Sequence, residues 1–351
     1  MPASSLSADG TAPSAVAPLR VVALGGGTGL STLLRGLRNY VVSPDQPTQG
    51  LIAELSAVVT VTDDGGSSGK LREDFNMLPP GDLRNCMVAL SAQEDLLTRL
   101  FNHRFRSGRS LKGHSLGNLF VAALTEITGD FALAIQLSSK ILATRGHIYP
   151  ATTANTKLVA EMDDGSLVRG ETKISASRHR IVELMLDPPS PKPLPETLAA
   201  IERADLITVG PGSLYTSLIT NLLVDGIAPA LVKARGLCVY VCNLMTQANE
   251  SLGLTAADHI ERIYAHTGEP IFDYALVNTA PFRPETITRY AAESASPIVA
   301  DIERIEALGV RVITGDFARE DGFVRHDAAR VTEALLELGR SKGLGTRVQG
   351  T

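Results

Sequence analysis

Short apolar runs alternate along the chain with segments whose apolar residues recur at helical spacing. Runs at 21–24, 55–62, 204–209, 237–243, 274–278 and 310–314 predict strands. Segments 119–127, 131–142, 255–266, 284–294, 300–308 and 327–340 predict helices. Because strands and helices alternate, the pattern predicts an α/β fold: a Rossmann-like, largely parallel sheet with helices on both faces, plus a helical segment.

One segment breaks this alternation. Between residues 146 and 187, short strand-like runs flank the Asp163-Asp164-Gly165-Ser166 turn, one of them expected over 167–174. They predict a small β insertion, which a proline-dense linker closes. The expected organisation is a disordered leader at 1–18, a first α/β part at 19–145, insertion and linker at 146–195, a second α/β part at 196–341 and a flexible tail at 342–351.

Composition narrows the class of protein. The 351 residues are 44% hydrophobic and carry a formal net charge of −5, which argues against a nucleic-acid partner. No run approaches the ~20 apolar residues of a membrane helix, and the start does not resemble a signal peptide, so a cytoplasmic protein without a membrane partner is expected. Cys86, Cys238 and Cys242 are expected to be core residues rather than metal ligands.

A glycine-rich stretch follows the first predicted strand and opens the first predicted helix. Glycines let the backbone approach an anion, and the N–H groups at a helix start point toward it. The match to the dinucleotide fingerprint G-x-G-x-x-G is incomplete, because Leu30 takes the place of the last glycine. A turn that merely joins strand to helix is the alternative. The candidate phosphate contacts are Gly25, Gly26, Gly27, Thr28, Gly29 and Ser31.

Acidic residues follow the second predicted strand. Asp63 and Asp64 stand where a nucleotide-binding sheet commonly holds a ribose hydroxyl or a metal ion that bridges phosphates. Ser67 and Ser68 behind them could donate hydroxyl groups to the same ligand. The alternative is an ordinary surface turn at Asp64-Gly65, which leaves the other residues of the stretch without a role.

Two later helix starts add polar candidates. Asp82 is expected to cap a helix that places Arg84 and Asn85 in its first turn, although an arginine there could equally be a surface residue. The motif Gly-His114-Ser115-Leu-Gly formally matches the nucleophile elbow of serine hydrolases. It lacks the preceding buried strand, so we do not expect a hydrolase. His114 and Asn118 are instead expected at a helix start, either near the ligand or packed in the core.

A second glycine turn follows the strand at 204–209. Gly210, Gly212 and Ser213 repeat the chemistry of the first turn, and the two turns could face each other and direct two helix ends at one nucleotide. Asn243 and Asn278 end later strands and could contact a base or sugar, or could be turn residues.

Six motifs occur together in one order. They are GGGTGLS (25–31), TDDGGSSG (62–69), PPGDLRNC (79–86), GHSLGNL (113–119), GPGSLYTS (210–217) and VCNLMTQ (241–247). In this combination the chain resembles the YvcK-type gluconeogenesis factors, relatives of the CofD-type 2-phospho-L-lactate transferases, over roughly residues 19–340.

The resemblance implies a cytoplasmic protein that binds nucleotide sugars such as UDP-N-acetylglucosamine and connects carbon metabolism with cell shape and wall synthesis. It adds Tyr290 and Arg325 as expected ligand contacts. Some relatives carry a phosphorylatable threonine where this chain has Ala328, so regulation by phosphate there is in doubt. A homodimer and an unidentified protein partner are left open.

Two functions fit these residues. The first is a regulatory protein that senses a UDP-sugar or another nucleotide-diphosphate ligand without turnover. The second is a transferase of the 2-phospho-L-lactate transferase type, in which Asp63 or Asp64 would hold a magnesium ion on the diphosphate. No cofactor is firmly implied, and magnesium is the only candidate.

Overall fold

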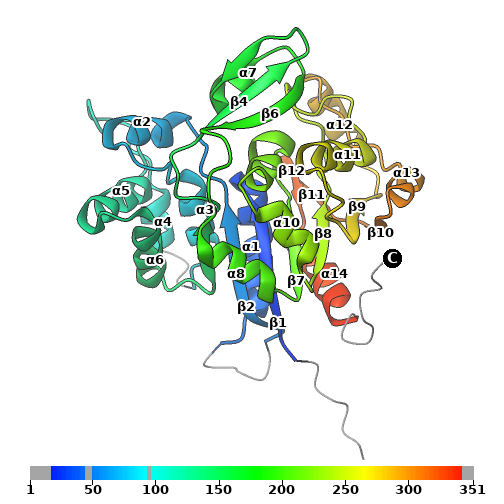
Figure 1. The fold of residues 1–351 in the computed structure, drawn as a ribbon, viewed down its shortest axis with the longest axis horizontal. Coiled ribbons are helices and arrows are strands. Elements are labelled where there is room, and N and C mark those ends of the chain that lie inside the picture. Colours follow the sequence, from blue (N-terminus) through cyan, green and yellow to red (C-terminus); the bar gives the residue numbers. More distant parts are fainter. Residues whose placement is uncertain (1–16, 44–49, 93–95, 342–351) are drawn as a thin grey trace, which may run out of the picture.

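The central element is a seven-stranded sheet in which every pairing is parallel (Figure 1). The computed structural model describes residues 17–43, 50–92 and 96–341. The predicted tail and nearly all of the predicted leader lie outside these residues. The strand order is β10-β9-β8-β7-β1-β2-β3, with bounds β1 Leu19–Gly25, β2 Ile52–Val59, β3 His147–Pro150, β7 Leu206–Val209, β8 Leu237–Val241, β9 Tyr274–Asn278 and β10 Arg311–Gly315.

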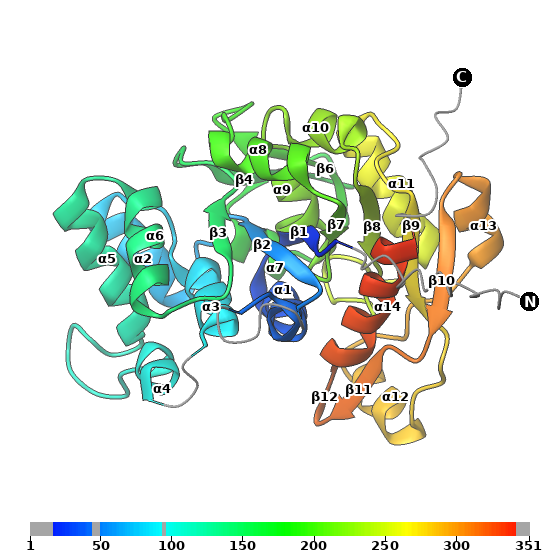
Figure 2. The ribbon, with the colours of Figure 1, turned by 90° about the horizontal axis from the view of Figure 1, so that it is seen from below.

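Helices cover both faces of this sheet because its strands are apolar on both sides (Figure 2). In β1, Val21 and Ala23 belong to the core on one face, and Val22 and Leu24 to the core on the other. The first face carries α1 (Gly27–Leu37), the 3-10 turn Arg38–Tyr40, α3 (Gly81–Leu90) and α14 (Ala328–Ser341). The second carries α8 (Pro195–Arg203), a π-helix (Leu214–Ile219) that continues into α9 (Thr220–Leu222), α10 (Ile227–Lys233), α11 (Ala256–Thr267) and α13 (Ile302–Ala307). The predicted α/β fold with helices on both faces is confirmed.

A helical lobe lies beyond the β3 edge. It contains α2 (Gly66–Phe75), α4 (Leu96–Asn102), α5 (Leu116–Thr128) and α6 (Phe131–Ile141). Ser115 is the N-cap of α5, its side chain accepting a hydrogen bond from the Asn118 N–H at 3.2 Å. The expected cap of α3 is wrong: Pro80 occupies the N-cap position, and Asp82 turns its carboxylate toward the glycine loop instead.

The predicted β insertion exists, with two corrections. Its antiparallel sheet has the order β5-β4-β6, built from β4 (Lys157–Met162), β5 (Leu167–Arg169) and β6 (Ile181–Asp187). The run 147–150, expected within the insertion, is β3 of the main sheet, pairing with β2. The strand expected over 167–174 stops at Arg169, because Gly170 has φ of +96° and α7 (Glu171–Ala176) follows.

Sequence periodicity missed a hairpin near the C-terminal end of the chain. Here β11 (Ala318–Asp321) pairs with β12 (Phe323–His326), and α12 (Pro284–Ala291) lies beside them. The residues of β11 and β12 are too polar to show the alternation of apolar and polar positions that is typical of a strand. Among the described residues no single helix is long and apolar enough to cross a membrane, although the bent pair Leu214–Leu222 and Ile227–Lys233 together reach that length and composition.

Candidate functional site

The two glycine turns meet at the carboxyl ends of β1 and β7. A methyl group on Gly29 would lie 2.4 Å from the Pro211 carbonyl oxygen, and one on Gly212 would lie 3.2 Å from the Ser217 side chain. At Gly29 only glycine lets the two backbones approach so closely, whereas the Gly212 contact lies within the second turn and its helix. Asn221 strengthens the junction, because its buried side chain donates to the Gly25 carbonyl at 2.9 Å and to the Ser217 carbonyl at 2.7 Å.

A pocket of about 270 Å³ opens over this junction. Nine of the residues singled out from the sequence line it: Gly26, Gly27, Thr28, Gly29, Gly212, Ser213, Asn243, Tyr290 and Arg325. The other lining residues were not among the candidates from the sequence; they are Thr32, Pro211, Ser217, Leu244, Met245, Thr246, Gln247, Val324 and His326. The pocket lies where open α/β sheets hold their ligands, beyond the carboxyl ends of the strands.

The start of α1 offers N–H groups to the pocket. Gly27, with φ of +61°, is its first residue, and Thr28 and Gly29 follow in the pocket wall. The first N–H groups of a helix have no acceptor in a preceding turn. The Gly27 N–H donates to Asp82 Oδ2 at 2.8 Å, and the next two residues, Thr28 and Gly29, line the pocket. Anion binding at this helix end, predicted from the sequence, stays a prediction.

The helix that follows the second glycine turn, the π-helix Leu214–Ile219, has a buried carboxylate at its start. Glu250 Oε1 accepts a hydrogen bond from the Thr216 hydroxyl at 2.7 Å, and the carboxylate also accepts from backbone N–H groups of Leu214–Thr216. Burial raises the pKa of Glu250, while these hydrogen bonds lower it. A carboxylate of the chain therefore already lies at the start of the π-helix. The second turn contributes Gly212, Ser213 and Ser217 to the pocket rather than a second open helix end.

The hairpin β11–β12 and α12 form the opposite wall. The Tyr290 hydroxyl accepts a hydrogen bond from the Val324 N–H at 2.9 Å, which joins α12 to β12. Arg325 follows and is exposed at the pocket rim. His326 Nε2 donates to the Cys242 carbonyl at 3.0 Å, and burial lowers the His326 pKa to about 4. His326 is therefore neutral at physiological pH, and the guanidinium of Arg325 supplies the positive charge on this wall.

Three predicted residues lie beside the pocket lining, inside the fold. Gly25 ends β1, and its carbonyl also accepts the Thr60 N–H at 3.1 Å. Ser31 is buried in α1 and donates to the Thr28 carbonyl at 3.1 Å. Gly210, with φ of +90°, donates its N–H to the Leu24 carbonyl at 2.9 Å. These residues shape the two turns.

A second group of predicted residues forms a polar network between α2 and α5. Ser67 Oγ lies 3.0 Å from His114 Nδ1 and accepts a hydrogen bond from Asn118 Nδ2 at 3.2 Å. Whichever of the two groups donates, this hydrogen bond joins the His114 side chain to Ser67. The partner of His114 is therefore Ser67 and not Ser115, and no strand precedes Ser115 within the described residues 96–114. This agrees with the expectation that the motif is not a nucleophile elbow.

Arg84, Asn85 and Ser68 lie around the base of this network. Arg84 is buried in α3, donates to the Asn102 side chain at 2.9 Å, and has its pKa lowered by burial. Asn85 hydrogen-bonds to the Asp82 carboxylate. Ser68 is buried, and a methyl group on Gly81 would lie 2.4 Å from its Oγ. None of the three lines the pocket described above.

The two aspartates that follow β2, Asp63 and Asp64, hydrogen-bond to different parts of the chain. Asp63 Oδ1 accepts the Gly65 N–H at 2.9 Å and so closes the local turn. Asp64 Oδ1 accepts both the N–H and the hydroxyl of Thr172, at 2.8 and 2.6 Å, and so holds the β insertion. Burial, followed by the negative charge of Asp63, raises the pKa of Glu171 to about 9. The carboxylates beside the pocket thus come from several elements.

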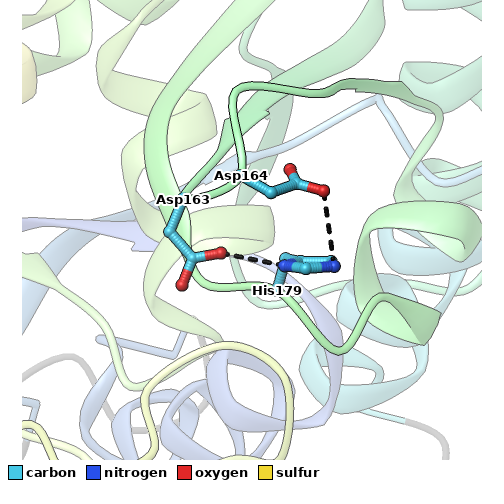
Figure 3. Close-up of side chains that lie close together, drawn as sticks. All are labelled: Asp163, Asp164 and His179. Carbon is cyan, nitrogen blue, oxygen red and sulfur yellow. Dashed lines mark hydrogen bonds and ion pairs between the residues drawn. The ribbon is translucent and has the colours of Figure 1, made fainter.

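A separate acidic cluster lies at the exposed tip of the insertion (Figure 3). His179 Nδ1 is 3.0 Å from Asp163 Oδ1, and His179 Nε2 is 3.4 Å from Asp164 Oδ2. Its ligand atoms lie within 4.8 Å of one another, and in the described part of the chain only this trio of His, Cys or acidic residues does so. The two carboxylates approach opposite nitrogens of the ring, so one ion cannot use both contacts. The arrangement is that of an exposed histidine between two carboxylates.

The fold is that of a Rossmann-like α/β protein with a pocket at the carboxyl ends of its strands. The family profile described as 2-phospho-L-lactate transferase CofD matches residues 21–318. The chain therefore belongs to the CofD family, and within it to the gluconeogenesis-factor branch that its curated relatives define.

Those relatives cover nearly the whole chain. The gluconeogenesis factor of Halalkalibacterium halodurans is 48% identical over 90% of this chain and 95% of its own length. The gluconeogenesis factor of Bacillus subtilis is 46% identical over 91% of this chain and 98% of its own length. A crystallised member of the UPF0052 family from Bacillus halodurans superposes with a TM-score of 0.86 at 46% identity, covering 91% of this chain and 99% of the other.

Proposed function

We propose that this chain is a cytoplasmic regulatory protein that binds a nucleotide sugar of the UDP-N-acetylglucosamine type and links carbon metabolism to wall synthesis and cell shape. The observation that carries the proposal is the pocket between the glycine turns and the Tyr290–Arg325 wall. N–H groups at the start of α1 suit a phosphate, Arg325 suits the second phosphate, and the Tyr290 ring suits a base or sugar. The link to carbon metabolism is supported by the gluconeogenesis-factor relatives, and the link to wall synthesis and cell shape follows from the resemblance to the YvcK-type factors alone.

The pocket lining favours binding over catalysis. Among its described residues, Arg325 carries the only formal charge, and His326 is neutral with its Nε2 engaged by a backbone carbonyl. The carboxylates Asp63 and Asp64 lie outside this lining. Binding of a diphosphate can thus be explained by backbone N–H groups and one guanidinium, as expected for a sensor that does not transform its ligand.

The transferase alternative rests on the CofD family and the polar groups beside the pocket. In that case a magnesium ion would neutralise charge on the diphosphate. Asp63 could contribute an oxygen, because only its Oδ1 is used within its own turn. Asp64 fits this role less well, because the chain uses it to hold Thr172.

A thermal-shift series with UDP-sugars and guanine nucleotides, each with and without magnesium, tests the proposal. A ligand at about 100 times its dissociation constant stabilises the protein by about 2.7 kcal/mol. We expect this for UDP-N-acetylglucosamine without metal. A guanine-nucleotide shift that requires magnesium, followed by consumption of the nucleotide, would favour the transferase. If no nucleotide changes the melting temperature, the pocket assignment is wrong.

The variant Gly27→Val tests the glycine loop itself. A methyl group at Gly27 would meet nothing within 4 Å, so the valine side chain would enter the space for a ligand. Gly129→Val is the matched control, because Gly129 has a similar φ of +66°, open surroundings and a place at the end of α5. Both variants carry the same backbone strain, about 1–3 kcal/mol. Only Gly27→Val is expected to lose UDP-sugar binding, and retained affinity would contradict the assignment.

A further inference from the structure

The chain places one of its own carboxylates at the phosphate-binding end of α1. Asp82, in the first turn of α3, accepts the Gly27 N–H at 2.8 Å across 55 residues of sequence. A carboxylate at the first N–H of a helix makes the same contact as a phosphate oxygen. The first of the N–H groups at this loop therefore has an anionic partner before any ligand enters.

The contact is built into the fold. A methyl group on Gly26 would lie 2.9 Å from Asp82 Oδ2, so the glycine lets the carboxylate reach under the loop. The positive charge of Arg84 and the Asn85 side chain favour the ionised form, while burial and nearby Asp63 oppose it. Two residues of the same helix, Arg84 and Asn85, thus favour the ionised Asp82 carboxylate, and the absence of a side chain at Gly26 leaves space for it.

A negative charge at this position affects ligands according to their own charge. In a sugar nucleotide each of the two phosphates is substituted on both sides and carries one negative charge, whereas a free nucleoside diphosphate ends in a terminal phosphate that carries about −1.5 to −2 by itself. The repulsion from Asp82 rises with the charge held near Gly27, and it is strong because water is partly excluded there. The penalty therefore falls mainly on the free diphosphate.

We propose that Asp82 is a specificity-determining residue that occupies the first phosphate contact of the glycine loop and selects sugar-linked diphosphates over free nucleoside diphosphates. The proposal rests on the proposed function and adds that the site disfavours free nucleoside diphosphates. Thr28 and Gly29 offer their N–H groups to the ligand, while Asp82 keeps that of Gly27.

The test compares UDP with UDP-N-acetylglucosamine by calorimetry at about pH 8 in the presence of a chelator, so that no metal screens the charge. Asp82→Asn keeps an oxygen that can accept the Gly27 N–H but removes the charge. Asp273→Asn is the matched control, because Asp273 also accepts a backbone N–H, that of Cys238 at 2.8 Å, before the start of β9. We expect Asp82→Asn to raise the affinity for UDP about tenfold more than that for the UDP-sugar, since only electrostatic repulsion changes. The control should leave the ratio unchanged.

An unchanged ratio in Asp82→Asn, including equal weakening of both ligands, would overturn the proposal and leave Asp82 a purely structural role. If Asp82→Asn fails to fold, a salt series on the wild type replaces it. Screening should then bring the two affinities together, and a ratio independent of salt would overturn the proposal. If the wild type binds UDP but not the UDP-sugar, the proposed function fails, while the response of UDP affinity to Asp82→Asn still decides the role of Asp82.

Discussion

The Tyr290 hydroxyl and the Val324 N–H lie 2.9 Å apart, and this hydrogen bond joins α12 to the β11–β12 hairpin. Arg325 is the next residue in the chain. The resemblance gave Tyr290 and Arg325 as separate ligand contacts. The hydrogen bond shows that Tyr290 also holds the strand that carries Arg325. Tyr290 can act on a ligand through its ring and also by fixing the strand that carries the guanidinium.

This connection predicts the behaviour of Tyr290→Phe. The variant keeps the ring but removes the acceptor for the Val324 N–H, which should lower the free energy of unfolding by about 1 kcal/mol. Affinity for the UDP-sugar should fall several-fold, because Arg325 loses its fixed position. Tyr264→Phe is the matched control, since the Tyr264 hydroxyl accepts the Phe272 N–H at 3.4 Å in a region that does not line the pocket.

Calorimetry and urea unfolding of both variants separate the two effects. Equal stability losses with weaker binding only in Tyr290→Phe would support the connection. Unchanged affinity in Tyr290→Phe would show that Arg325 is held without this hydrogen bond.

Asp64 leads to a prediction about the β insertion. Its carboxylate accepts the N–H and the hydroxyl of Thr172 at the start of α7, so Asp64→Ala leaves both donors without their partner. We expect faster proteolysis between residues 146 and 195, with a loss of about 1–3 kcal/mol in local stability. Asp64→Asn retains an acceptor oxygen and should resemble the wild type.

Limited proteolysis followed by mass spectrometry measures this effect. The same Asp64→Asn variant also distinguishes the two readings of the acidic pair. If Asp64 were a metal ligand, the asparagine variant would lose any magnesium dependence of ligand binding. Equal cleavage rates in wild type and Asp64→Ala would show that the insertion is held by other contacts.

The sheet could be predicted from the sequence because its strands are buried on both faces and so read as continuous apolar runs. β8, with Cys238 between apolar neighbours, shows this pattern clearly. The β11–β12 hairpin could not be predicted in the same way, because Arg319, Glu320 and Arg325 interrupt any alternation. Its strands are defined by pairing with each other, and a pairing between neighbouring polar segments leaves little signal in hydrophobicity.

The parts of the candidate site that could be predicted from the sequence are the glycine turns, whose role depends on the backbone. The glycine turns could be recognised because Gly29 permits close approach to Pro211 and Gly27 adopts a φ of +61°, and both residues line the pocket. The partners of side chains were not predictable. Contacts such as Asp82 to Gly27 or Asn221 to Gly25 join residues 55 and 196 positions apart, and no local pattern specifies them.

His326 leads to a prediction of pH dependence. Burial lowers its pKa to about 4 in the native state, against about 6.5 in the unfolded chain. Between these values the unfolded chain binds a proton that the native protein does not, so stability falls as pH decreases through this window. At about pH 5 the loss should be about 2 kcal/mol relative to pH 7. Asp82, whose pKa burial raises to about 6, acts in the opposite direction.

His326→Gln isolates the contribution of the imidazole, because Asp82 and the other groups stay the same in both proteins. The glutamine amide can still donate to the Cys242 carbonyl, and it does not titrate. Urea unfolding at about pH 7 and about pH 5 should show a smaller acid loss in the variant than in the wild type, by about 2 kcal/mol. His103→Gln, at an exposed position, should follow the wild type. Parallel pH profiles for wild type and His326→Gln would show that His326 gains its proton in the native state as readily as in the unfolded chain.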